Sequence, residues 1–291
     1  MANTQELRKR RKSISNTRKI TRTMELVASS KARKAQDAAD ASRPYAETLA
    51  QVVSDLSAGE TDLTHPLMAQ RDPQRVMVLV ATSDRGLCGA FNANVLRHAQ
   101  QVIEAHKAAG RQVEVISLGK KGASTLRFLG HPPSESHSGI MDAPTYSQVL
   151  RLIDPIIERF TAASIDRVEV VYPRFINIAR QEPVTRVLLP AGGDEAASDQ
   201  TAGAAMVDFI YSPPPQELLA TLIPQTVRTA LFSALLQTSA GEHNARRMAM
   251  KNATDAASDI LKTINRTYNR VRQGKITQEI AEIVGAVEAM S

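Results

Sequence analysis

NTRKITRTMELVASSKARKAQ, residues 16–36, lies inside a long N-terminal segment that predicts a single helix. Proline is absent before Pro44 and glycine before Gly59, so nothing in residues 3–57 ends a helix early. At about 1.5 Å per residue this helix would be roughly 80 Å long, and Pro44 would kink it rather than end it. Apolar or small residues recur at a nearly seven-residue spacing, as in a coiled-coil seam: Leu7, Ile14, Met24, Ala28, Ala35, Ala38, Tyr45, Leu49, Val52 and Leu56.

A second long helix is predicted at the other end of the chain. Pro224 is the last proline, which leaves 67 residues that could form a helix of roughly 100 Å. Residues 239–259 are mostly small and polar, whereas the last segment has one broad apolar face. Neither helix can bury its seam alone, so we expect the two to pack as an antiparallel coiled coil. Its small seam residues bury little apolar area, and we expect a surrounding partner to hold it.

Strands and helices alternate in the middle of the chain, which predicts a small α/β sheet with helices packed on it. The expected strands are residues 75–83, 112–119, 166–175 and 183–190, and the expected helices are residues 92–110, 122–130 and 145–162. Residues 191–205 are small and acidic and predict a flexible loop. The predicted domains are an N-terminal helix at 1–58, an α/β domain at 75–211 and a C-terminal helix at 213–291.

Charge is concentrated at the N-terminus. Residues 1–36 hold eleven cations against Glu6 and Glu25, a net charge of +9, while the whole chain carries +6. Such a basic arm indicates an acidic protein surface or a polyanion as partner, although a solvated helix face has the same composition. No aromatic residue occurs before Tyr45 to stack on bases, so a nucleic-acid-binding coiled coil is the weaker alternative.

Composition also limits the cellular setting. The N-terminus has no apolar stretch behind its charges, so we expect no secretory signal. No run approaches the roughly 20 apolar residues of a transmembrane helix, and we expect no direct membrane span. The single cysteine, Cys88, excludes a disulfide framework.

ATSDRGLCGAF, residues 81–91, follows an apolar strand as phosphate-binding loops do. It matches neither GxxxxGK[ST] nor GxGxxG, and the later turn at 119–122 offers no hydroxyl for magnesium. Cys88 has no histidine in its local sequence, so a buried thiol is the better interpretation than a nucleophile. The six histidines lack metal-ligand spacing, and no GxSxG occurs. We therefore expect no catalytic residue, cofactor or metal, and keep a nucleotide-dependent α/β enzyme using this loop as an alternative.

Five ordered stretches make the chain similar to one family, the gamma subunits of F-type ATP synthases. They are NTRKITRTMELVASSKARKAQ, SRPYAETL, TSDRGLCGAFN, ARRMAMKNATDAA and YNRVRQGKITQEIAEIV. The resemblance covers nearly the whole chain, and it implies that the terminal helices pair as an axle with a central Rossmann-like α/β domain at its foot.

The resemblance also implies a rotor. In that family the axle turns inside three alpha and three beta subunits, while the foot joins the epsilon subunit and the c-ring, and ATP is made in beta. The chain itself would then have no catalytic residue. It would lie peripherally at the cytoplasmic face of a bacterial inner membrane, because no transit peptide and no cysteine-bearing chloroplast insert are visible.

Particular residues acquire expected roles from the resemblance. Arg272, Gln273 and Thr277 match positions that hydrogen-bond to a catch loop of beta, and Met24 matches the position where the axle meets the acidic lever of beta. Four cations are expected to face that lever: Lys19, Arg22, Lys31 and Arg33. An apolar bearing at the end of the axle would consist of Ile276, Ile280, Ile283, Val284 and Val287.

Overall fold

The computed structural model describes residues 4–59, 65–178, 180–192 and 214–290. Its elements are α1 (Thr4–Gly59), η1 (Pro66–Met68), β1 (Arg75–Ala81), α2 (Phe91–Ala108), β2 (Gln112–Leu118), α3 (Lys120–Phe128), β3 (Glu135–His137), α4 (Tyr146–Thr161), β4 (Arg167–Phe175), β5 (Gln181–Leu189) and α5 (Pro215–Met290). The chain divides into two compact units. Residues up to 28 and from 246 onward form the coiled-coil unit, and residues 29–245 form the globular unit, so α1 and α5 contribute to both.

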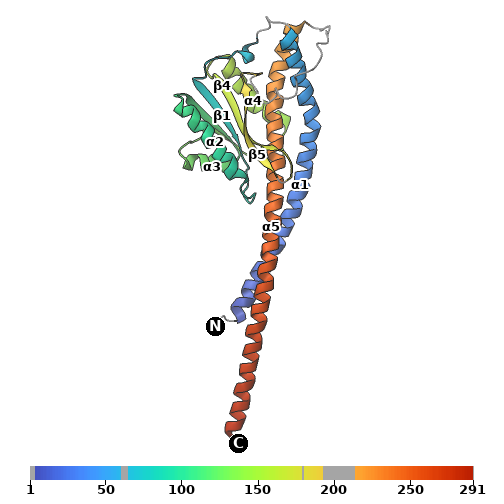
Figure 1. The fold of residues 1–291 in the computed structure, drawn as a ribbon, viewed down its shortest axis with the longest axis vertical. Coiled ribbons are helices and arrows are strands. Elements are labelled where there is room, and N and C mark those ends of the chain that lie inside the picture. Colours follow the sequence, from blue (N-terminus) through green and yellow to red (C-terminus); the bar gives the residue numbers. More distant parts are fainter. Residues whose placement is uncertain (1–3, 60–64, 179, 193–213, 291) are drawn as a thin grey trace. The chain divides into compact units, whose positions relative to one another are not determined.

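The globular unit contains a five-stranded sheet of order β3-β2-β1-β4-β5 (Figure 1). Strands β3, β2, β1 and β4 run parallel, and β5 pairs antiparallel with β4. Parallel strands are covered on both faces and therefore tolerate an unbroken apolar run such as the one in β1. This arrangement confirms the predicted fold class, an α/β domain joined to two long terminal helices that pack together.

Each face of the sheet has its own apolar core. Val76, Val78 and Val80 of β1 pack with α2 and Leu126 of α3. The alternate residues Met77 and Leu79 face a larger core that contains residues of α1, α4 and α5. Because successive side chains of a strand point to opposite faces, one strand supplies both cores. The long helices are thus part of the fold of the globular unit.

Helix α5 meets the sheet through a stripe of residues four apart. Leu219, Ile223, Val227, Leu231 and Leu235 are all at most 3% exposed. A four-residue step keeps side chains close to one face of a helix, so this stripe buries a continuous apolar surface. The same stretch lies in a helix region, Gln216–Val287, that contains an 18-residue window of mean hydropathy 1.3, apolar enough to cross a membrane. Because 44% of that window is buried and core helices meet the same criterion, the absence of a membrane span stays a prediction.

Two details differ from the sequence expectations. Strand β3 was not expected, because its three residues are polar and show no apolar alternation. Ala38 and Tyr45 are exposed rather than in the seam, which instead passes through Ala39, Ser42 and Ala46. Small side chains at these positions let helices approach closely, whereas a tyrosine would hold them apart. The helix continues through Pro44, and the predicted loop at 191–205 lies outside the described residues from 193 onward.

An ion pair joins the amino-terminal ends of β1 and β4. The Arg75 guanidinium and backbone N–H both donate to the Asp166 carboxylate, at 2.8 Å in each case. The Asp166 side chain is 6% exposed. The hydrogen bond from Arg75 holds the pKa of that carboxyl below its usual value. Because the pKa is lowered on folding, the pair stabilises the fold above the unfolded pKa of about 4 and stops doing so as the pH falls through the folded pKa.

We predict that Asp166→Asn lowers the free energy of unfolding by about 1–3 kcal/mol at neutral pH, because a charged hydrogen-bonded partner is lost. Urea unfolding of the full chain at pH 7 and near pH 3 measures this. The wild type and the variant should converge in acid. Asp72→Asn, an exposed carboxylate nearby, is the control and should change little. An equal deficit at both pH values would contradict the assigned role of the charge.

Candidate partner-binding surface of the paired helices

In the coiled-coil unit α1 and α5 pack along a seam with alternating steps of three and four residues. Its buried or half-buried positions include Leu7, Arg11, Ile14, Thr21, Met24, Glu25 and Ala28 on α1, and Met250, Thr254, Ala257, Leu261, Ile264, Tyr268 and Val271 on α5. The Arg11 guanidinium lies 5.2 Å from the centre of the Tyr268 ring, and Thr21 bonds Thr254. These two pairs run in opposite order along the helices, so the packing is antiparallel.

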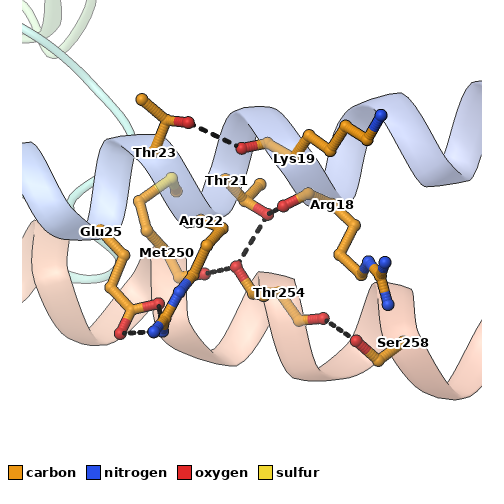
Figure 2. Close-up of polar contacts among 9 residues, drawn as sticks. All are labelled: Arg18, Lys19, Thr21, Arg22, Thr23, Glu25, Met250, Thr254 and Ser258. Atoms are coloured by element: carbon orange, nitrogen blue, oxygen red, sulfur yellow. Dashed lines mark hydrogen bonds and ion pairs between the residues drawn. The ribbon is translucent and has the colours of Figure 1, made fainter.

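A polar layer interrupts the seam (Figure 2). The Oγ1 atoms of Thr21 and Thr254 lie 2.8 Å apart, although Thr21 is only 9% exposed. Thr21 donates its proton to the Arg18 carbonyl at 3.1 Å, and Thr254 has its single proton within reach of both Thr21 Oγ1 and the Met250 carbonyl, the latter at 2.8 Å. A satisfied polar pair inside an otherwise apolar seam favours one register, because a shifted helix would leave both hydroxyls buried without that contact.

The predicted contact residues on α1 lie in different environments. Met24 is half-buried at the seam, and Lys19 is exposed. Arg22 is neutralised within its own helix, because its Nη1 lies 3.0 and 2.9 Å from the two carboxylate oxygens of Glu25 (Figure 2). An exposed i,i+3 pair of this kind is weak and can be exchanged for another acid.

The other two predicted cations belong to the globular unit. Arg33 is exposed, whereas Lys31 donates to the Asp142 carboxylate at 2.7 Å. Arg22 and Lys31 thus each have an acidic neighbour within their own unit.

A cationic groove of about 990 Å³ lies on the coiled-coil unit. Its basic lining consists of Arg8, Lys9, Arg11, Lys12, Arg18 and Lys19 from α1 and Lys262 from α5. None of the described residues that line it is acidic. Lys262 pairs with Asp259 at 2.9 Å, and the other six cations repel each other, so the groove would attract an acidic partner segment. Of the predicted basic face only Lys19 lines this groove. The helical spacing of Arg8, Lys12 and Lys19 would have indicated it from sequence.

The end of α5 has no partner helix within the described chain. Val271 is the last half-buried residue, and every described side chain from Arg272 to Met290 is exposed. This segment is about 28 Å long at the helical rise. The predicted bearing residues are 46–65% exposed: Ile276, Ile280, Ile283, Val284 and Val287. An apolar stripe of this length in solvent marks a surface that another molecule covers.

The three predicted catch residues, Arg272, Gln273 and Thr277, lie at the start of this exposed segment. Gln273 and Thr277 are one turn apart, and the Thr277 hydroxyl donates to the Gln273 carbonyl at 3.0 Å. The side chains of Gln273 and Thr277 therefore lie on the same face of α5. Their polar atoms face solvent next to the apolar stripe.

The loop at residues 81–91 is closed by its own chain. The two oxygens of Asp84 accept the backbone N–H groups of Lys120, at 3.1 Å, and Gly139, at 2.9 Å. Lys120 begins α3, so a carboxylate of the protein occupies the helix N-terminus where a phosphate would bind. A Cβ on Gly119 would lie 2.3 Å from the Thr82 carbonyl oxygen, which leaves no space between loop and helix. This geometry argues against a nucleotide site here.

Cys88 takes part in a polar network beneath the same loop. It is 3% exposed, and its Sγ lies 3.3 Å from Asn92 Nδ2. Asn92 also bonds Ser83 Oγ at 2.7 Å, which ties the loop to the first turn of α2. The thiol is thus a packed part of the turn. Across the described residues no three His, Cys, Asp or Glu side chains gather as metal ligands would.

Comparisons with known proteins give a consistent family. The family model described as ATP synthase matches residues 3–290. The ATP synthase gamma chain of Gemmatimonas aurantiaca is 41% identical over 291 residues, covering 100% of this chain and 99% of the relative. That of Leptospira biflexa is 40% identical over 292 residues and covers 100% of both chains.

Solved structures share the fold. One chain of the Euglena gracilis mitochondrial ATP synthase structure with OSCP, F1 and c-ring aligns with a TM-score of 0.66 at 20% identity, covering 99% of this chain and 94% of that one. A chain of the central stalk and c-ring structure from Tetrahymena thermophila aligns with a TM-score of 0.60 at 21% identity, covering 80% and 99%. With a matching family model over nearly its full length and relatives at 40% identity, the chain belongs to the ATP synthase gamma chain family.

Proposed function

We propose that this protein is the central rotor subunit of an F-type ATP synthase and couples rotation of a c-ring to conformational cycling of catalytic beta subunits. The observation that carries the proposal is the exposed end of α5, where five large apolar side chains face solvent in a chain of this family. Its partners are three alpha and three beta subunits around the helical pair, and the epsilon subunit and c-ring at the α/β domain. It is peripheral to the membrane, at the cytoplasmic face of a bacterial inner membrane.

The proposed role is not catalytic. The loop most similar to a phosphate-binding loop is occupied by Asp84 and by close backbone contacts of Gly119. ATP chemistry then belongs to beta, and this chain acts by presenting different surfaces to three equivalent sites. A pair of helices has no threefold symmetry, so three beta subunits around it cannot all have the same contacts.

Two kinds of surface suit rotation. The apolar stripe from Ile276 to Val287 makes non-directional contacts, so a surrounding sleeve can hold it at any angle. The cationic groove attracts an acidic lever through charge interactions that act over about one Debye length. These interactions do not require one orientation of the lever. We assign Met24, Lys19, Arg22 and Arg33 to the lever contact, while Lys31 pairs with Asp142 inside the globular unit. Because Arg22 pairs with Glu25 one turn away on its own helix, it offers an exchangeable contact of modest strength.

We assign Arg272, Gln273 and Thr277 to the beta catch contact. Their exposed polar side chains lie at the start of the apolar stripe, which begins at Ile276. They can therefore form hydrogen bonds with a loop of beta.

Co-purification tests the proposal directly. The native chain should co-elute with alpha and beta subunits as one ATPase-active complex, while the isolated chain should bind neither labelled ATP nor DNA specifically. A free monomer in the cell extract would contradict the rotor assignment. Specific ATP binding by the isolated chain would instead favour the nucleotide-dependent enzyme, and DNA binding the nucleic-acid binder.

We predict that Ile280→Asp weakens association with alpha and beta subunits about tenfold, because one apolar side chain loses its burial and a charge enters an apolar sleeve. Ile280 is 55% exposed, so thermal unfolding of the isolated chain should be unchanged. Gln278→Asp, on another face of the same segment, is the matched control. Equal loss of association in both variants would contradict the assignment of the bearing to the face that contains Ile280.

We predict that the double variant Lys12→Glu/Lys19→Glu slows association with alpha and beta subunits about tenfold at low salt, because the groove loses its attraction for an acidic surface. The difference should shrink near 0.5 M salt, where the Debye length is only about 4 Å. Arg97→Glu, an exposed cation on α2, serves as control. An association rate that ignores both charge reversal and salt would rule out electrostatic docking in the groove.

A further inference from the structure

The loop between β3 and α4 contacts both long helices through one residue, Asp142. Lys31 of α1 donates its Nζ to Asp142 Oδ1 at 2.7 Å. On α5, His243 Nε2 lies 3.2 Å from the Asp142 carbonyl oxygen and 3.5 Å from Oδ1. The Ser239 hydroxyl donates to the same carbonyl at 3.5 Å. All four residues belong to the globular unit, so this junction is internal to one compact body.

The same loop is also tied to the carboxyl end of the sheet. The Gly139 N–H donates to Asp84 Oδ2 at 2.9 Å, and Asp84 lies three residues after the end of β1. Met141, next to Asp142, is fully buried in the larger core. Hydrogen bonds therefore connect the sheet to the helices through Asp84, Gly139 and Asp142. The loop from Gly139 to Asp142 is four residues long. A segment held at its start, middle and end has little freedom to swing.

Charge reinforces the junction. The hydrogen bond from Lys31 lowers the pKa of Asp142, and the positive charges of Lys31 and Arg85 act in the same direction. The carboxylate thus stays ionised across the physiological range. His243 is 1% exposed, so on the α5 side this contact is shielded from water, while the Lys31 side is partly open.

We infer that Asp142 is a positioning residue that transmits force between the α/β domain and both long helices. This rests on the proposed rotor function. Apolar contacts between the sheet and α5 are strong but non-directional, so they resist separation more than sliding. Hydrogen-bonded ion contacts depend on direction, and a single residue that holds both helices opposes sliding of one along the other.

The test uses the assembled complex in proton-tight vesicles and measures proton pumping per ATP hydrolysed. Asp142→Asn removes the charge but keeps the carbonyl contacts with α5, and Lys31→Met removes the α1 contact. Asp40→Asn is the matched control, because Asp40 pairs with Arg43 inside α1 alone. Both test variants should lower the pumping ratio relative to the control, and the double variant should be no worse than either. The charge swap Lys31→Asp/Asp142→Lys should restore the ratio.

Hydrogen exchange on the full-length chain gives a second readout. Protection of the amides in residues 138–145 should fall about two- to fivefold in Asp142→Asn, the range that a partly exposed ion pair contributes. A purely structural role would reduce the yield of complex without changing the pumping ratio. A ratio for Asp142→Asn equal to that for Asp40→Asn overturns the inference while leaving the rotor assignment intact. Failure of the wild type to assemble with alpha and beta overturns both.

Discussion

Pairing of α1 with α5 is the constraint on which the rest of the structure depends. A helix with one narrow apolar stripe cannot stay ordered alone over dozens of residues, because most helical stability comes from packing. The two helices solve this unequally. In the globular unit large residues such as Leu56 and Leu231 join the sheet core, whereas in the coiled-coil unit the seam contains Ala28, Thr21 and Ala257. The coiled-coil seam also buries Leu7, Leu261 and Ile264, and in the globular unit the helices additionally cover a sheet.

The cationic groove and the apolar stripe that we propose as partner surfaces lie on the coiled-coil unit. Most of the cationic side chains lie off the seam, and the stripe from Ile276 to Val287 lies beyond the last seam residue, Val271, so a partner can reach both. In a pair of helices stabilised mainly by its own burial, those isoleucines would pack between the two helices. The partner surfaces and the modest stability of the pair thus have a common cause, the division of apolar residues between an inner and an outer face.

The α/β domain shows how a nucleotide-like fold can serve another purpose. Its strand order and its glycine-containing turns have the geometry of a phosphate site, but Asp84 takes the backbone donors and Thr82 fills the space beside Gly119 and Gly122. The polar groups of that crevice are used to hold the loop at Gly139 and, through it, Asp142. Fold similarity by itself would have suggested chemistry that these contacts oppose.

From the sequence alone came the two long helices, the four main strands and the exposed apolar end of α5, because period and proline placement act locally along the chain. Tertiary structure decided what depends on distant partners. The seam runs through Ala46 instead of Tyr45 since the approach of α5 selects the smaller side chain, and Lys31 is paired because folding brings Asp142, 111 positions away, beside it. Short polar β3 likewise exists only because β2 offers it an edge. Local pattern determines which elements form, and long-range contact determines which of their residues remain available to partners.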